Sequence, residues 1–142
     1  PAKHRWASKS HVSLAQLSDE PLIMREDGSG SRACLESALT GAGKSLRDLR
    51  VTLELGSNEA IKESVLRSMG VAILSERTIE KEIKAGKLHG LTISGLDLSR
   101  ELFVTWNKRR VVTQAARLFL EVLNASPRSA NESRSDGRRH RK

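Results

Sequence analysis

The sequence predicts an α/β domain with an open, largely parallel sheet. Short apolar segments follow one another along the chain, and each leads through a polar or glycine-rich turn into a segment with helical spacing. Strands that alternate with helices of about ten residues are typical of parallel sheets, whose crossovers are right-handed. At 142 residues the chain is long enough to bury the core of one compact domain.

The chain begins with a connector. Residues 1–10 are basic, and Val12 to Leu17 are predicted to form a short amphipathic turn. Pro21 blocks any helix at that point, and the residue before a proline favours extended backbone. The chain is therefore expected to enter its first strand fully extended.

The first strand, turn and helix contain the most distinctive stretch of the sequence. Leu22 to Met24 are predicted to form a short buried strand, and Asp27 to Gly30 a turn that admits positive φ. Either Ser29 or Ser31 then caps a helix over residues 33–39.

The start of this helix has the chemistry of an anion site. It presents free amide N–H groups and the positive end of the helix dipole, and Arg25 and Arg32 lie nearby in the sequence. An ordinary capped helix without a ligand is the alternative, because the Rossmann fingerprint is absent. Glu26 also has two interpretations: it orients a ligand amine or hydroxyl, or it forms a salt bridge with Arg25 or Arg32.

The second unit follows a glycine stop at residues 40–43. Alternating apolar residues predict a strand with one buried face: Val51, Leu53 and Leu55. A turn at residues 56–58 leads into a helix that ends at residues 68–70. Its inner face is predicted to hold Ile61, Val65 and Leu66. Its outer face is predicted to hold Lys62, Glu63 and Arg67.

In the third unit, the apolar run Val71–Leu74 predicts a strand covered on both faces. Ser75 is expected to cap a helix that turns Ile79 and Ile83 inward and is closed by Gly86. Because the turns at the carboxyl ends of parallel strands converge on one edge, the turns at residues 28–32 and 56–58 are expected to line a common crevice.

Two further strands and a last helix complete the pattern. The strands are predicted over Leu88–Ser94 and Leu102–Trp106. Thr113 caps a helix whose side chains are mostly apolar, so this helix needs a partner surface. Residues 125–142 hold half of the net charge of +8 and no large aliphatic side chain, so they are expected to form a disordered basic tail.

Residues 41–45, Gly-Ala-Gly-Lys-Ser, look like the end of a nucleotide-binding P-loop. The position of the first glycine of that motif holds Ala38, and the flanking order is helix then strand. A P-loop must run from a strand into a helix so that its N–H groups wrap the phosphates. Nucleotide binding is therefore not expected here.

The composition indicates no catalytic, metal or cofactor site. The four histidines are scattered without ligand spacing, and Cys34 lacks a recognisable base partner and is expected in the core. A single cysteine favours a reducing compartment, so the cytoplasm is the expected location. No apolar run reaches the length of a membrane span, and no secretion signal is found. A chain that begins at Pro1 without Met is compatible with a piece of a longer protein.

Five collinear phrases carry a family resemblance: residues 21–32, 54–62, 70–75, 82–88 and 100–104, followed by an Ala-Ala-Arg-Leu-Phe-Leu helix. In order and spacing, residues 1–123 resemble the effector-binding region of LysR-type transcriptional regulators. The first phrase, which contains Arg-Glu-Asp-Gly-Ser-Gly-Ser-Arg, is similar to the Arg-Glu-x-Gly-Ser-Gly-Thr/Ser-Arg turn of one branch. That branch includes regulators of carbon-fixation and sulfur-assimilation operons.

The resemblance implies one lobe of a fold like that of type 2 periplasmic binding proteins, with a Rossmann-like open sheet, plus a returning strand and helix of the other lobe. The implied divisions are residues 1–20, the end of the first lobe and a connector; residues 21–98, the second, effector-binding lobe; residues 99–124, the hinge return with a strand and helix of the first lobe; and residues 125–142, the tail. Met24 and Arg100 are expected at the hinge.

The resemblance also implies that a small anionic metabolite binds between the lobes and that the protein is not an enzyme. The effector is expected to contact Arg25, Ser29, Gly30, Ser31 and Asn58. A homodimer or tetramer is expected, and promoter DNA would be bound only through an N-terminal winged helix-turn-helix domain absent from this chain. A free-standing solute-binding protein of the same fold is the alternative. Ser68 departs from the glycine usual in the family, and serine tolerates positive φ less well.

Overall fold

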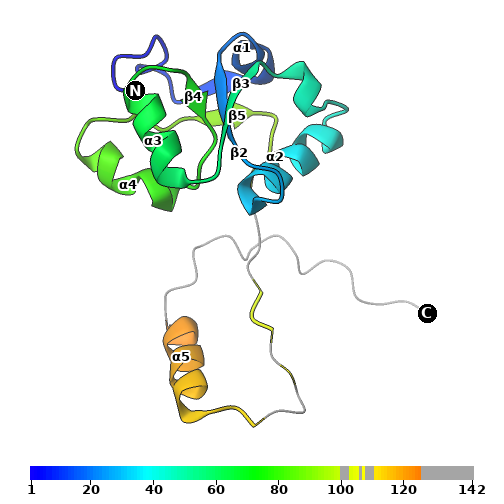
Figure 1. Ribbon diagram of the computed structural model, residues 1–142, viewed down its shortest axis with the longest axis vertical. Coiled ribbons are helices and arrows are strands. Elements are labelled where there is room, and N and C mark those ends of the chain that lie inside the picture. Colours follow the sequence, from blue (N-terminus) through cyan, green and yellow to red (C-terminus); the bar gives the residue numbers. More distant parts are fainter. Residues whose placement is uncertain (100–102, 106, 108–110, 126–142) are drawn as a thin grey trace. The chain divides into compact units, whose positions relative to one another are not determined.

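Helices and strands alternate along residues 1–99 of the computed structural model, as the sequence predicts (Figure 1). The structure describes residues 1–99, 103–105, 107 and 111–125. The chain divides into unit 1, Pro1–Glu101, and unit 2, Leu102–Lys142. Unit 1 contains, in order, β1 (His11–Ser13), α1 (Leu14–Ser18), β2 (Leu22–Arg25), α2 (Gly30–Gly41), β3 (Val51–Leu55), α3 (Asn58–Leu66), β4 (Val71–Ala72), α4 (Glu76–Lys84) and β5 (Thr92–Ser94). Unit 2 contains α5 (Gln114–Ala125).

Three parallel strands form the central sheet in the order β3-β2-β4. Leu22 pairs with Val51 of β3 on one side and with Val71 of β4 on the other. Because β2 is the middle strand, its first three residues are at most 4% exposed. This confirms the predicted buried strand, whose residues are apolar on both faces as expected for a covered parallel sheet.

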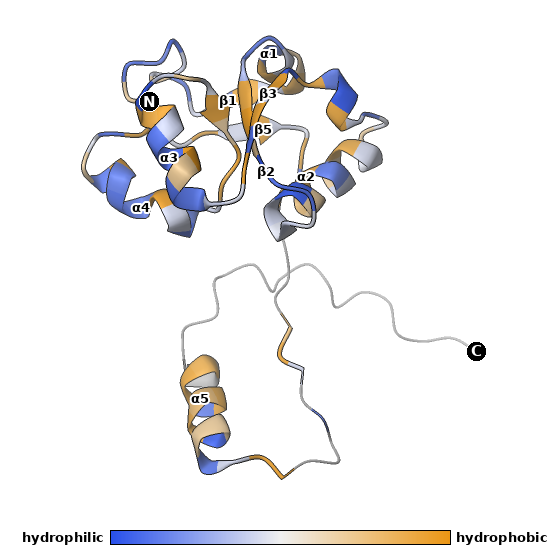
Figure 2. Cartoon of the chain, in the orientation of Figure 1, coloured by the Kyte–Doolittle hydropathy of each residue, from blue (hydrophilic) through white to orange (hydrophobic). Residues whose placement is uncertain are grey.

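Helices cover both faces of β2. Leu22 and Met24 lie in one apolar cluster with Leu35 of α2, whereas Ile23 lies in a second cluster with Ile61 of α3. Successive residues of a strand point to opposite faces, so α2 and α3 pack on opposite sides of the sheet. Figure 2 shows the strands of unit 1 as mainly hydrophobic, between helices that are hydrophobic on one side only.

A second, two-stranded parallel sheet joins β1 to β5, with Val12 opposite Ile93. The sequence predicted only a turn over residues 12–17 and a longer strand over residues 88–94. A capping box explains the difference, because Ser13 Oγ accepts from the N–H of Gln16 and the Gln16 side chain accepts from the N–H of Ser13. This cap starts α1 at Leu14, so β1 offers only three residues and β5 pairs over three.

β4 is shorter and less covered than predicted for Val71–Leu74. Only Val71 and Ala72 pair with β2, and both are half-buried. β4 lies at the edge of its sheet and has a strand neighbour on one side only. Just before it, a Cβ on Gly70 would lie 2.4 Å from the carbonyl oxygen of Pro21, so glycine is required where β4 approaches β2.

α3 ends in a Schellman motif. The N–H of Ser68 donates to the carbonyl of Val65 at 2.9 Å, and the N–H of Met69 donates to the carbonyl of Ser64 at 3.1 Å. Ser68 has a φ of 59°, and no other non-glycine residue in the described ranges has a positive φ. The strain expected at this serine therefore has a structural basis.

Lys62 was predicted on the charged outer face of α3, and this was wrong. The residue is 8% exposed. Its Nζ lies 2.9 Å from Glu59 Oε1 and 2.9 Å from Glu82 Oε1 of α4. Paired carboxylates allow an ammonium group to be buried, and α4 covers the side of α3 that periodicity alone assigned to solvent.

α2 and the segment after it behave as predicted for a chain without a P-loop. α2 ends at Gly41, and a 3₁₀ turn at Leu46–Asp48 then leads into β3. The order is helix, loop, strand, which cannot wrap a nucleotide phosphate. Cys34 on α2 is half-buried rather than fully in the core, and its thiol lies 3.3 Å from the carbonyl oxygen of Leu98.

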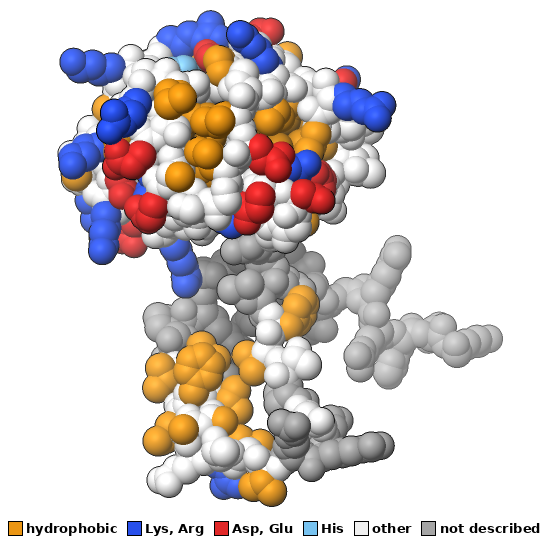
Figure 3. Space-filling model, viewed as in Figure 1, with side chains coloured by type: hydrophobic (Ala, Val, Ile, Leu, Met, Phe, Trp, Pro, Cys, Tyr) orange, Lys and Arg blue, Asp and Glu red, His pale blue; other side chains and the backbone are white. Residues whose placement is uncertain are grey.

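Thr113 caps α5 in unit 2 as predicted, because the N–H of Ala116 donates to Thr113 Oγ1 at 3.2 Å. Phe119 is 62% exposed and Val122 is 64% exposed, and Figure 3 shows hydrophobic side chains crowded on this helix. Among the described residues of unit 2, nothing covers the apolar face that requires a partner surface.

The predicted strand Leu102–Trp106 is not found among the residues that can be described. Residues 103–105 form no strand, and Phe103 is 80% exposed. A strand needs a neighbouring edge for its backbone hydrogen bonds, and the described part of unit 2 holds only a helix. Leu102, Trp106 and the predicted tail from residue 126 onward lie outside the described residues.

Candidate functional site

The carboxyl ends of β2 and β3 lie side by side, with Arg25 paired to Leu55. The chain continues from β2 into α2 on one face of the sheet and from β3 into α3 on the other. This divergence between neighbouring parallel strands marks a crevice at the carboxyl edge, which is the usual ligand position in open α/β sheets. It is the edge at which the sequence predicted two turns to meet.

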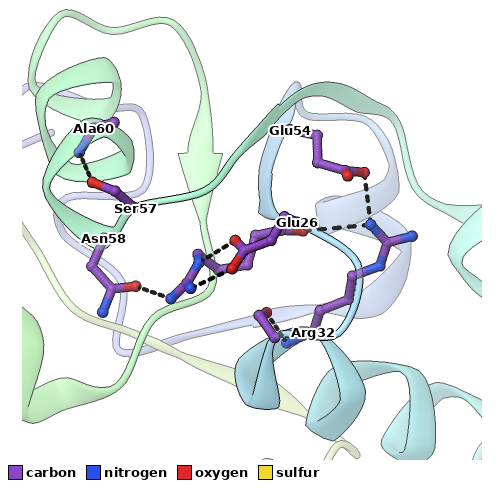
Figure 4. A network of polar contacts seen from close by, with 8 residues as sticks. Glu26, Arg32, Glu54, Ser57, Asn58 and Ala60 are labelled. Atoms are coloured by element: carbon purple, nitrogen blue, oxygen red, sulfur yellow. Dashed lines mark hydrogen bonds and ion pairs between the residues drawn. The ribbon is translucent and has the colours of Figure 1, made fainter.

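Arg25, the last residue of β2, lies at the centre of this crevice. Its Nε and one Nη each donate to a carboxylate oxygen of Glu26 at 2.7 Å, and the other Nη donates to Asn58 Oδ1 at 2.6 Å (Figure 4). These hydrogen bonds hold the pKa of Glu26 below its ordinary value and raise the pKa of Arg25. Of the interpretations of Glu26, the salt bridge with Arg25 is the one found.

Arg32 supplies a second guanidinium group. It donates to Glu36 Oε1 at 2.9 Å. It also donates to Glu54 Oε2 at 2.6 Å (Figure 4). A longer contact of 3.5 Å joins it to the carbonyl oxygen of Arg25. The two carboxylates raise the pKa of Arg32. Arg32 therefore links α2 to β3 and is paired with a carboxylate on each of these elements.

Ser29, and not Ser31, caps α2. The N–H of Arg32 donates to Ser29 Oγ at 3.2 Å, and Ser29 is 7% exposed. Gly30 and Ser31 are the first residues of the helix, and the turn before them contains Gly28 with a φ of 81°. Local sequence thus accounts for this helix start, because the hydroxyl and the glycine turn are the expected capping elements.

The start of α3 is capped by Ser57. The N–H of Ala60 donates to Ser57 Oγ at 3.1 Å, so Asn58 is the first helical residue (Figure 4). This placement leaves the Asn58 side chain able to reach Arg25. Of the two residues predicted at the hinge, Met24 is a buried residue of β2, and Arg100 lies outside the described residues.

The crevice holds more acidic than basic groups. The two guanidinium groups belong to Arg25 and Arg32. They meet the three carboxylates of Glu26, Glu36 and Glu54. The pairing leaves one negative charge in excess, whereas the sequence suggested two arginines open to an anion. A mostly buried guanidinium group requires partners, and these carboxylates supply them. Figure 3 likewise shows acidic side chains interspersed with basic ones on this face of unit 1.

The crevice lies apart from two cavities of unit 1. Unit 1 contains cavities of about 520 and 500 Å³, and neither is lined by Arg25, Ser29, Gly30, Ser31 or Asn58. The larger cavity lies against both apolar clusters and is lined mainly by hydrocarbon side chains, including Val12, Val71 and Leu91. The polar crevice and this apolar cavity are therefore separate features.

Sequence reasoning placed Ser57 in the crevice without its capping role, and it missed Glu36 and Glu54 there. Glu36 lies four residues after Arg32 on one helix, a spacing from which their pairing could have been predicted. Ser57 directly precedes the predicted helix, which is the usual position of a cap. Glu54 gave no such signal, because its partner Arg32 lies 22 residues away in sequence.

Within the described ranges, none of the helices combines the length and the apolar character that a membrane span requires. In these same residues, no three His, Cys, Asp or Glu side chains are grouped so as to hold a metal ion.

A family model described as LysR substrate binding domain matches residues 1–128. The HTH-type transcriptional regulator CbbR of Rhizobium meliloti (strain 1021) is 35% identical over 126 residues, which are 89% of this chain and 40% of that protein. The phosphonates import ATP-binding protein PhnC of Anaeromyxobacter dehalogenans (strain 2CP-C) is 38% identical over 114 residues, which are 80% of this chain and 23% of that protein.

A solved structure is similar in both fold and sequence. The Synechocystis PCC6803 CcmR regulatory domain in complex with 2-PG matches with a TM-score of 0.75 and 32% identity, over 91% of this chain and 61% of that one. The chain thus spans less than half of either curated relative and about three fifths of the solved domain.

Proposed function

This chain belongs to the LysR substrate binding domain family, and from that premise we propose that it senses a small anionic metabolite for a LysR-type transcriptional regulator. The observation that carries the proposal is Arg25, whose guanidinium lies at the carboxyl edge of the sheet between a carboxylate and a side-chain amide. Guanidinium groups and helix N-termini are the donors that proteins use for phosphate and carboxylate groups. The 2-PG bound to the related Synechocystis domain supports the same ligand class.

The effector contacts proposed are Arg25, Ser29, Gly30, Ser31 and Asn58, with Met24 and Arg100 at the hinge. Arg25 supplies the positive charge, and the Asn58 amide offers its NH2 group to the ligand while its oxygen stays bound to Arg25. Gly30 and Ser31 offer the backbone N–H groups of the first turn of α2. Ser29 acts through its cap, which fixes the direction of these N–H groups.

Effector binding is proposed to change lobe or subunit geometry, because a ligand shifts an equilibrium by the difference in its affinity for the two states. We propose a cytoplasmic homodimer or tetramer without catalytic activity. Promoter DNA would be read by a winged helix-turn-helix domain of the whole protein. The regulator CbbR, 35% identical over most of this chain, supports this assignment.

A free-standing solute-binding protein is the alternative. It would use the same crevice for a transported anion. Transcriptional regulators among the relatives favour the first proposal, and the PhnC match covers only 23% of that transport protein.

Thermal unfolding tests the anion proposal. We expect 2-phosphoglycolate, sulfate or phosphate to raise the melting temperature of the protein at constant ionic strength, because a ligand at a hundred times its Kd stabilises the folded state by about 2.7 kcal/mol. Arg25→Gln should remove most of this increase. Differential scanning fluorimetry over a concentration series of each anion measures both effects.

The matched control is Arg67→Gln, which removes the same charge from an exposed residue at the end of α3, where Arg67 lies 4.0 Å from Glu63. It should leave the anion response unchanged. An anion response that is absent from the starting protein, or equal in Arg25→Gln and Arg67→Gln, would contradict the proposed site.

A further inference from the structure

Building on the proposed function, we infer that Glu26 is a built-in competitor of the effector: its carboxylate occupies the guanidinium of Arg25, and a ligand anion must displace it to bind. The two groups meet through two parallel hydrogen bonds of 2.7 Å, from Nε and one Nη to the two carboxylate oxygens. This fork is the geometry in which guanidinium groups bind carboxylate and phosphate ligands. Glu26 thus takes the place that the ligand needs.

The Glu26 side chain is the partner of Arg25 that can leave. It is 40% exposed, whereas the Arg25 side chain is 19% exposed and comes from the middle strand of the sheet. The backbone of Glu26 is fixed, because its N–H donates to the carbonyl of Leu55 at 3.2 Å and its carbonyl accepts from Ser29 at 3.2 Å. Displacement therefore needs only side-chain rotation into solvent, and the strand end and turn keep their places.

The charges of the crevice point the same way. With Glu26 in place, two guanidinium groups face three carboxylates, so an added anion meets a negative excess. When Glu26 turns outward, two guanidinium groups and two carboxylates remain in the crevice, and both carboxylates pair with Arg32, so an anion can take the vacated hydrogen bonds of Arg25. A phosphoryl, sulfate or carboxylate group carries two oxygens on one atom and can accept both hydrogen bonds of Arg25 at once. Chloride has a single acceptor atom and cannot form this pair of bonds.

The third hydrogen bond of Arg25 keeps its guanidinium group in position while the ligand replaces Glu26. The remaining Nη donates to Asn58 Oδ1 at 2.6 Å, and Asn58 is the first residue of α3. This amide carries no charge, so it holds the guanidinium without opposing a ligand anion. Arg25 is thereby oriented by one partner and masked by the other.

Glu26→Gln tests the inference. Removing the charge weakens the competitor while preserving its size, so 2-phosphoglycolate should bind about two- to fivefold tighter than to the starting protein, as expected for loss of one partly exposed ion pair. Isothermal titration calorimetry at constant ionic strength measures the affinities. The matched control is Glu36→Gln, since the Glu36 side chain is 41% exposed and pairs with Arg32 rather than Arg25.

If Glu26 competes with the ligand for Arg25, the gain in affinity from Glu26→Gln must depend on Arg25, whereas a general change in charge would act without it. Glu36→Gln should change the affinity less than Glu26→Gln, and in an Arg25→Gln background Glu26→Gln should give no gain beyond that of Glu36→Gln. Equal gains from Glu26→Gln and Glu36→Gln, with binding by the starting protein intact, would overturn the competitor role and leave the proposed function standing. No binding by any variant would instead overturn the proposed function, and the competitor role with it.

Discussion

Among single residues, Lys62 is the only charged side chain in the described ranges that is buried, at 8% exposure. Hydrogen bonds to Glu82 and Glu59 raise its pKa, and the bond from Lys62 lowers the pKa of Glu82. One oxygen of Glu82 is buried without a hydrogen-bond partner, and Lys62 is the largest of the contributions that stabilise this carboxylate. This pair fastens α4 to α3, the helix that carries Asn58.

The pH dependence of stability follows from these shifts. A carboxyl with a folded pKa below its unfolded value stabilises fully above the unfolded pKa, and this stabilisation is lost as the pH falls through the folded pKa. We expect the Glu82→Gln variant to lose less stability than the starting protein as the pH falls from about 7 to about 3. The midpoints of urea unfolding over this range measure the difference. Glu80→Gln is the control, because Glu80 is 57% exposed and pairs only with exposed Lys84. Identical pH profiles for the two variants would argue against the buried pair.

On the alkaline side the sign is reversed. Lys62 has a raised folded pKa, so its contribution is complete below the unfolded value and is lost only as the pH rises through the folded one. The pair therefore acts as a constant stabilising contact through the neutral range, and effector measurements near pH 7 are free of its titration.

At the level of elements, the helix ends are set by local hydrogen bonds. Ser29, Ser57 and Thr113 cap three helices with their side chains, and a Schellman motif closes α3. These contacts join residues a few positions apart, so most were open to prediction from spacing. The helix end at Ser68 is strained, because this serine holds a left-handed backbone conformation that is unfavourable for any residue with a side chain.

Ser68→Gly should stabilise unit 1 by about 0.5 to 1 kcal/mol, since relief of the left-handed strain exceeds the extra chain entropy of glycine. Ser64→Gly, inside the same helix, should instead destabilise it by about 0.5 kcal/mol, the difference in helix propensity between serine and glycine. Urea denaturation at neutral pH gives both free energies of unfolding. The same sign for both substitutions would contradict the role assigned to the φ of Ser68.

At the level of unit 1, β2 is shared by two apolar clusters on opposite faces of the sheet. The first cluster contains Trp6 and the second contains Ile61. Because Leu22, Ile23 and Met24 are consecutive in one strand, neither cluster can come apart without disturbing the other. Arg25 follows directly, so the position of the crevice depends on both.

Ile61→Ala tests this coupling. We expect a loss of about 2 to 5 kcal/mol in the free energy of unfolding. The midpoint of the unfolding transition should move by the same amount whether it is followed by the fluorescence of Trp6 or by far-UV circular dichroism. A Trp106→Phe background leaves Trp6 as the only tryptophan, because the chain has two. Separate transitions for the two signals would mean that the clusters unfold independently.

The sequence by itself determined the α/β class, the strand at residues 22–24, the turn and capped helix after it, and the family to which the chain belongs. These features are local: alternation, glycine turns and capping hydroxyls act between residues close in the chain, and the family phrases are short stretches in a fixed order. The lengths of the strands were less well predicted, because the lengths of β4 and β5 depend on the strands beside them.

Only the tertiary structure decided which charges meet. Arg25 bonds to Asn58 33 residues away, Arg32 to Glu54 22 residues away, and Lys62 to Glu82 20 residues away. Helical periodicity describes an isolated helix, so it assigned Lys62 to solvent. Packing of α4 on α3, and of α2 and α3 against β2, brings these distant side chains within hydrogen-bond distance. For buried Lys62, the cost of an unpaired charge favours its carboxylate partners.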